Sequence, residues 1–168
     1  MSEIKNENSK PALYIFMRND LDSLTSGRAM AQASHATNCC EEEFKKCSAG
    51  HLQKPESCSP VMNERWGVLN RLYTKWKGDK NFGTAIVLSV NETDIWSIES
   101  FCDGLANAED DVPFFLHYGD VVDPTYRIKD GDSYHVLPVL TCFWVFGDRN
   151  DSALQHITQD LELYPLGS

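Results

Sequence analysis

Long hydrophobic runs are missing from this sequence, and their absence argues against membrane-spanning segments. The longest apolar stretches, such as residues 85–88 and 142–146, fall far short of the about 20 residues that a transmembrane helix needs. The N-terminal residues MSEIKNENSKP are polar and lack the apolar core of a signal peptide. We therefore expect a soluble cytoplasmic protein that has no membrane partner.

Positive charge is also scarce. The chain has 15 Lys and Arg against 25 Asp and Glu, which gives a net charge of −10. Because neutralising phosphates supplies much of the affinity of nucleic-acid-binding proteins, this acidity argues against non-specific binding to nucleic acid. It leaves room for a small, focused basic site.

Cysteine pairs with metal-ligand spacing are lacking as well. The group that invites a zinc interpretation consists of Cys39, Cys40, Cys47, His51 and Cys58. It contains no CxxC or HxxxH pair, and adjacent cysteines are poor joint ligands. We therefore expect thiols without a metal and no cofactor. A thiol- or zinc-dependent function through residues 39–58 is the weaker alternative.

The residues that are present suit one folded domain. A chain of 168 residues with 42% hydrophobic and 11% aromatic residues is near the commonest domain size and can fill a core. We predict a disordered tail over residues 1–11 and one domain over residues 12–163. Within it, residues 47–61 are rich in Ser, Pro and Gly without periodicity, which predicts an inserted surface loop.

Hydrophobic periodicity predicts the order β-α-α-β-α-β-β-α. The predicted strands cover residues 13–17, 83–90, 112–119 and 137–147, and the predicted helices cover residues 27–46, 62–76, 92–106 and 150–164. A long polar connection, DVVDPTYRIKDGDSYH, should join the last two strands. This order is typical of a single layered α/β domain with a mixed four-stranded sheet flanked by helices.

The stretch GRAMAQASHATNCC, residues 27–40, combines packing positions with polar ones. In a helix, positions i, i+4 and i+7 fall within roughly one 60° stripe. Arg28, Gln32 and His35 therefore point in similar directions. A second stripe holds the small residues Ala29, Ala33, Ala36 and Cys40. The pattern predicts a helix with one face close to a sheet and one face available for chemistry.

RNDL at residues 18–21 and GRAMAQASHA at residues 27–36 together resemble the signature of the peptidyl-tRNA hydrolase 2 family. That signature is a strand ending in an Arg-x-Asp-Leu-like sequence, followed by Gly-Lys-x-Ala-x-Gln-x-x-His-Ala at a helix start. Gly27, Gln32, His35 and Ala36 match it, whereas Arg28 stands where the family has lysine. The order of the predicted elements also fits that fold.

A second family landmark is Asp-Ala-Gly-x-Thr after the third strand, followed by a Thr-rich last strand. GDVVDPTYRIKDG occupies this place here, with Asp123 as the best counterpart of the aspartate. Thr125 or Thr141 can stand for the family threonines. The Ala-Gly pair is absent, and the connection is longer by several residues.

The resemblance implies an ester hydrolase that cleaves peptide from the ribose of tRNA, so peptidyl-tRNA is the implied partner. Because resembling proteins often pair, it also implies a homodimer. The implied catalytic residues are Arg28, His35 and Asp123, and the implied substrate-binding residues are Gly27, Gln32, Thr125 and Thr141. Arginine binds phosphate well but does not exchange protons. His35 and Asp123 are therefore the candidate pair that activates water.

Each of the helix residues also has a structural interpretation. Arg28 can pair with Asp20 or Asp22 in the preceding loop, and Gln32 can hydrogen-bond to the sheet edge. His35 can be a partly buried histidine whose hydrogen bonds are satisfied.

The other candidates have structural interpretations too. Asp123 precedes Pro124 and can form an Asx turn. His117 and His135, which flank the predicted connection, are further candidates for a functional role. The alternative function is a catalytically altered protein of the same fold that binds a nucleotide, RNA or a protein.

Overall fold

The computed structural model of the chain describes residues 8–48, 60–78, 83–107 and 115–165. Its elements are β1 (Pro11–Arg18), α1 (Ser26–Ser48), α2 (Pro60–Gly78), β2 (Ala85–Val90), α3 (Glu92–Ala106), β3 (His117–Asp130), β4 (Ser133–Asp148) and α4 (Ser152–Thr158). This order confirms the predicted sequence of elements and the layered α/β class. Residues 1–7 of the predicted tail and 49–59 of the predicted loop lie outside the described residues. Within the described part, no helix has the length and apolarity needed to cross a membrane.

The sheet is mixed and has the strand order β2-β1-β4-β3. Strand β1 runs parallel to β2 and antiparallel to β4, and β3 is antiparallel to β4. The central position of β1 accounts for its apolar sequence, because a strand covered on both faces has no solvent-facing side. After Pro11, every residue of β1 is buried.

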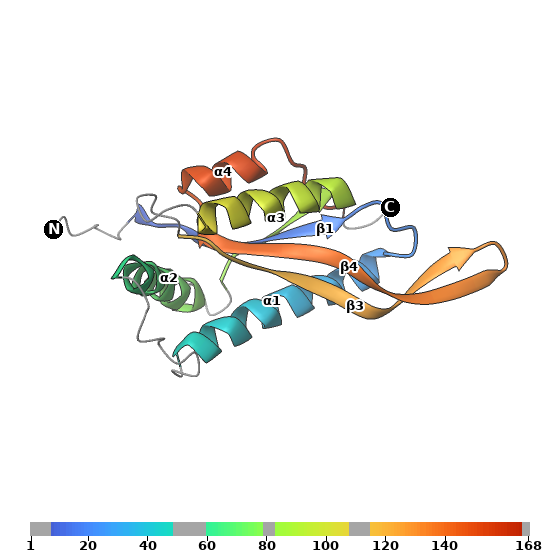
Figure 1. Cartoon of the computed structure of the whole chain (residues 1–168), viewed down its shortest axis with the longest axis horizontal. Helices are drawn as coiled ribbons and strands as arrows, with labels where there is room; N and C mark the ends of the chain where they lie inside the picture. Colours follow the sequence, from blue (N-terminus) through green and yellow to red (C-terminus); the bar gives the residue numbers. More distant parts are fainter. Residues whose placement is uncertain (1–7, 49–59, 79–82, 108–114, 166–168) are drawn as a thin grey trace.

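Helices cover both faces of the sheet, with α1 and α2 on one side and α3 and α4 on the other (Figure 1). Alternate residues of β1 serve the two layers, as the period of two in a strand requires. Leu13, Ile15 and Met17 pack in the cluster beneath α1 and α2, whereas Tyr14 and Phe16 pack beneath α3 and α4. The predicted small-residue stripe of α1 is largely buried: Ala29, Ala36 and Cys40 are at most 2% exposed.

The predicted polar connection between the last two strands is wrong. β3 and β4 continue as a paired ribbon through Asp130 and Ser133, joined by a turn in which Gly131 has φ of 58°. We call residues 126–137 the arm. Its far end projects beyond the helical layers (Figure 1). Helices do not cover this end of the ribbon, and its strands mix charged residues with exposed apolar ones such as Ile128, Tyr134 and Val136. Without a continuous apolar run, the segment was predicted as a connection rather than as strands.

Two irregularities in the β3–β4 pairing lie where the arm leaves the sheet. The register shifts between Val121 and Val122 and again between Asp123 and Tyr126. The first shift leaves Thr141 as an extra residue on β4, and the second leaves an extra residue on β3 around Pro124. Such bulges re-aim side chains and bend the ribbon. Here the bulges turn two predicted site residues, Asp123 and Thr141, toward α1.

The predicted last helix extends too far. Helix α4 ends at Thr158, and the chain then returns along the outer edge of β2. Ser89 N donates to Glu162 O at 2.9 Å, and Tyr164 N donates to Val87 O at 2.9 Å. The segment satisfies backbone groups of an edge strand, and this pairing competes successfully with continuation of the helix.

Candidate functional site

A cavity of about 370 Å³ lies between the start of α1 and the bulge of β3. Its lining consists of Arg28, Ala31, Gln32, Asp123, Thr125, Tyr126 and Arg127. Helix α1 supplies the first three of these residues, and β3 supplies the other four. The fold therefore brings together four residues that sequence reasoning selected from distant segments: Arg28, Gln32, Asp123 and Thr125.

Gln32 connects the two sides of the cavity. The residue is buried, with 8% of its surface exposed. The amide Nε2 donates to Asp123 Oδ2 at 3.4 Å, and the amide Oε1 accepts from the Thr141 hydroxyl at 3.0 Å. An amide nitrogen carries two hydrogens, so one donor is left for a ligand in the cavity. The structural interpretation of Gln32 as a link to the sheet is correct, and it is compatible with ligand binding.

Thr141 fixes the Gln32 side chain from the side away from the cavity. This residue is fully buried, and its hydroxyl lies 3.0 Å from both the Gln32 amide oxygen and the Val121 carbonyl oxygen. Thr141 does not line the cavity. Its bulge position on β4 directs the hydroxyl to α1, so it positions Gln32.

Asp123 is held in a fixed orientation. Its Oδ1 accepts from the backbone N of Thr125 at 2.9 Å and from the Thr125 hydroxyl at 3.2 Å. This is the Asx turn that Pro124 suggested, and Oδ2 faces Gln32 across the cavity. The structural role of Asp123 in the turn and its place in the cavity are therefore compatible, because the turn directs the carboxylate into the cavity.

Two guanidinium-bearing residues line the cavity. The exposed Arg28 donates from Nη1 to Ser23 O at 3.1 Å, and the Ser23 hydroxyl donates to Arg127 O at 3.0 Å. Ser23 thus ties the neighbourhoods of Arg28 and Arg127 together. Within the described residues, Arg28 forms no ion pair, so the suggested partners Asp20 and Asp22 do not hold it.

His35 is not part of this cavity. It is exposed, and within the described chain it makes no hydrogen bond, so the expected pairing with Asp123 is not seen. Two helical turns separate it from Arg28, a rise of about 10 Å along the axis, which carries it past the cavity. Gly27 is exposed at the start of α1 and does not line the cavity either.

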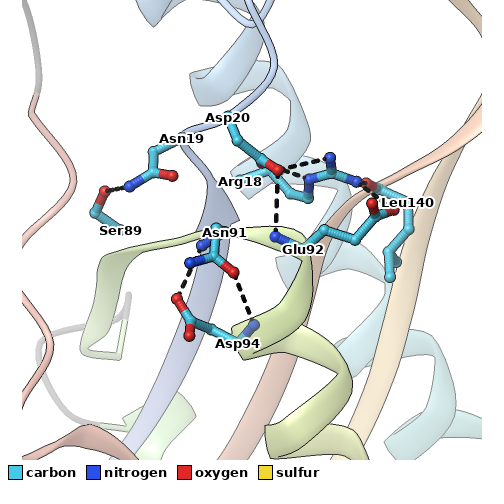
Figure 2. Close-up of polar contacts among 8 residues, drawn as sticks. All are labelled: Arg18, Asn19, Asp20, Ser89, Asn91, Glu92, Asp94 and Leu140. Atoms are coloured by element: carbon cyan, nitrogen blue, oxygen red, sulfur yellow. Dashed lines mark hydrogen bonds and ion pairs between the residues drawn. The ribbon is translucent and has the colours of Figure 1, made fainter.

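The RNDL segment builds an ion network around the buried Arg18 that sequence reasoning did not predict (Figure 2). Arg18 is 6% exposed. Its Nε and Nη2 donate to the Asp20 carboxylate at 2.7 and 3.0 Å, and its Nη1 donates to Glu92 Oε1 at 2.8 Å. Nη1 also lies 3.5 Å from Leu140 O, next to Thr141. A buried apolar strand that ends in arginine and is followed by an acid is the signal that could have revealed this network.

The network sets both the local charge and the start of α3. Partial burial by itself raises the pKa of Asp20, but the hydrogen bonds and charge of Arg18 outweigh it and leave that pKa below its ordinary value. At α3, Asn91 and Asp94 form a reciprocal capping box, also visible in Figure 2. Arg18 therefore joins β1, the start of α3 and β4 close to the site.

The two further histidine candidates lie elsewhere. His117 packs among the rings of Phe44, Trp66 and Trp144 with centroid distances of 5.2 to 5.3 Å, and burial lowers its pKa to about 4. His135 is on the arm, 3.2 Å from the Asp130 carboxylate. Neither residue lines the cavity, and the surroundings of His117 are those of a core residue.

The cysteines that invite the weaker zinc interpretation differ in their surroundings. Cys40 is buried, and burial raises the pKa of its thiol, whereas Cys39 is partly exposed. The side chains of Cys47, His51 and Cys58 lie outside the described residues. Among the described side chains, no group of three or more His, Cys, Asp or Glu is placed to hold a metal ion.

The cavity offers three chemical capabilities. The Arg28 guanidinium can bind an anion or polarise a carbonyl oxygen, the second N–H of Gln32 can donate, and the carboxylate of Asp123 can accept a proton. The chain matches no family in a comparison with protein-family models and has no significant match among curated proteins. Functional assignment therefore rests on the cavity and on the resemblance carried by residues 18–36.

Proposed function

We propose that the cavity hydrolyses the ester that joins a peptide to the ribose of tRNA. The observation that carries this proposal is that Arg28, Gln32, Asp123 and Thr125 line one and the same cavity. The resemblance to the peptidyl-tRNA hydrolase 2 family implies roles for all four residues. They come from segments some ninety residues apart in the chain, as the Gln32–Asp123 separation of 91 indicates. The mixed sheet and the order of elements support the same assignment.

The reaction needs an activated water and a stabilised oxyanion. Asp123 accepts a proton from water as its oxygen attacks the ester carbonyl carbon. The Arg28 guanidinium and the remaining Gln32 N–H donate to the oxyanion that forms. The carbon–oxygen bond to ribose then breaks, and the ribose oxygen takes up the proton held by Asp123. The new carboxylic acid releases its remaining proton to solvent, so the products are a free peptide carboxylate and tRNA with a free hydroxyl.

Arg28 fits this scheme as an electrostatic group. Arginine keeps its proton and can present parallel donors to an oxyanion or phosphate, so it replaces lysine only in a role that requires no proton transfer. The single base is then Asp123, which the Thr125 turn orients. His35, exposed and outside the cavity, has no part in the chemical step of this scheme.

The first test is release of tRNA from an N-blocked aminoacyl-tRNA by the purified protein. We expect Arg28→Ala to lower kcat by about 100-fold or more, the effect of removing one oxyanion donor. Arg149→Ala is the matched control, because Arg149 is exposed at the far end of β4, and it should keep the wild-type rate. Equal rates for Arg28→Ala and the control would exclude Arg28 from the reaction.

A second candidate function is binding of an RNA end without cleavage. The observation in its favour is that both Asp123 oxygens already accept hydrogen bonds, from Thr125 and from Gln32, which limits their access to a water proton. Tight binding of tRNA without release of the acyl group in the same assay would support this function instead.

A further inference from the structure

The arm has two unlike faces. Cross-strand partners lie on the same face of a ribbon, and so do residues two apart in one strand. The pairs Arg127↔Val136 and Lys129↔Tyr134 therefore share one face, which we call the basic face. The opposite face holds the partners Tyr126↔Leu137, Ile128↔His135 and Asp130↔Ser133.

Charge is segregated between the two faces. On the opposite face, the Asp130 carboxylate lies 3.2 Å from the His135 ring. On the basic face, Arg127 and Lys129 are exposed, and among the described residues neither forms an ion pair. Tyr134 and Val136 beside them are 64% and 56% exposed. The basic face thus combines two cations with an accessible aromatic ring in a protein whose net charge is −10.

The basic face begins next to the cavity. Arg127 is the first residue of this face and is also among the residues that line the cavity, where its backbone carbonyl is held. Ser23 contacts the two residues at once, through its carbonyl to Arg28 and its hydroxyl to Arg127. Lys129 follows Arg127 at about 7 Å along the strand. Arg127 and Lys129 therefore form a row of two cations along the arm, which leaves the sheet beside the cavity.

We propose that the basic face of the arm binds the single-stranded RNA segment whose 3′ end occupies the cavity. Arg127 and Lys129 contact successive parts of the phosphate backbone, and a base stacks on Tyr134 beside Val136. In a protein that is acidic overall, a polyanion is attracted to local groups of unpaired cations such as this one. A ribbon of two strands presents a narrow line of contacts, which suits a single strand better than a duplex. The identity of the end in the cavity rests on the proposed function.

The test is binding of a fluorescein-labelled single-stranded RNA of about ten nucleotides that ends in a 3′ hydroxyl. This probe has no ester, so binding is measured whether or not the protein cleaves. We expect Lys129→Ala to reduce the slope of log affinity against log salt by about 0.7, the contribution of one phosphate contact on a single strand. Tyr134→Ala should weaken binding about fivefold or more.

Matched controls lie outside the arm. Arg149→Ala removes an exposed cation, and Trp96→Ala removes an aromatic residue that is 54% exposed on α3. Both should bind the probe as wild type does. Wild-type affinity and salt slope for the two arm variants would overturn the proposal and would leave the arm as a surface for a protein partner. Equal binding of a blunt RNA duplex would overturn it as well.

The two proposals fail in distinguishable ways. If the arm variants lose RNA binding but the wild-type protein releases no tRNA from the ester, the RNA contact stands and hydrolysis is wrong. If the protein cleaves the ester and the arm variants bind and cleave as wild type does, hydrolysis stands and the RNA contact is wrong.

Discussion

At the scale of single residues, the buried hydrogen bond between Thr141 and Gln32 is the contact on which the site geometry depends most. Thr141→Val keeps the shape of the side chain but removes the hydroxyl, which leaves the buried Gln32 oxygen without its 3.0 Å partner. We expect the free energy of unfolding to fall by about 1–3 kcal/mol, measured by urea denaturation. Thr74→Val, on the exposed face of α2, should change it by less than about 0.5 kcal/mol. Equal effects of the two substitutions would show that the Thr141 hydroxyl is not important for stability.

His117 gives the folded protein a defined response to acid. Burial lowers the pKa of this histidine from 6.5 to about 4, so between these values the unfolded chain binds a proton that the folded chain does not. The contribution of His117 to the free energy of unfolding is therefore fully present above pH 6.5. It decreases as the pH falls toward 4, by up to about 3 kcal/mol.

The variant His117→Phe isolates this effect. A phenyl ring suits the aromatic surroundings and does not titrate, so the difference in unfolding free energy between wild type and variant should change between pH 6.5 and pH 4. Measuring urea denaturation of both proteins across this range cancels the contributions of the carboxylates. Parallel pH profiles would contradict the assignment of His117 as a buried neutral histidine.

Several site residues could be predicted from the sequence, and the reasons differ. Arg28 and Gln32 stand out because helical spacing and the resemblance select the same positions, and Asp123 follows from its place after the third strand. His35 was expected in the cavity because spacing fixes the direction of a side chain but not how far the neighbouring strand extends along the helix. Arg18 was missed because its partner Glu92 is distant in sequence.

At the scale of elements, the arm shows what pattern reading detects poorly. Strands β1 and β2 are marked by apolar runs, whereas the arm, which leaves the layered body, mixes charged and apolar residues and has no such run. The central part of each helix followed from its periodicity. The end of α4 did not, since the competing partner of that segment is the edge of β2, which is invisible in local sequence.

The turn of the arm makes a prediction at this scale. Gly131 has φ of 58°, and a Cβ there would meet no atom within 4 Å, so Gly131→Ala strains only the backbone. We expect a cost of about 1 kcal/mol, seen as faster amide hydrogen exchange in the arm. Gly104→Ala is the control, since Gly104 is an exposed helical residue with open space around it, and it should be neutral or stabilising. Unchanged exchange in the arm would contradict the turn geometry.

At the scale of the whole molecule, the candidate site and the arm lie at the same end. The start of α1, the bulges of β3 and β4 and the arm all lie at the end of the sheet where the ribbon leaves the helical layers (Figure 1). The cations at this end are Arg28 in the cavity and Arg127 and Lys129 on the arm. In an acidic molecule, such local cations can direct a polyanionic substrate toward the site.

The most direct measurement of the central claim compares two variants in single-turnover hydrolysis of an N-blocked aminoacyl-tRNA. We predict that Asp123→Asn lowers the rate by about 100-fold or more, because the amide does not accept the proton from water. His35→Ala should retain the rate of the wild type, as should the exposed carboxylate control Asp160→Asn. A wild-type rate for Asp123→Asn, or a loss with His35→Ala as large as that expected for Asp123→Asn, would contradict the assignment of ester hydrolysis to this cavity.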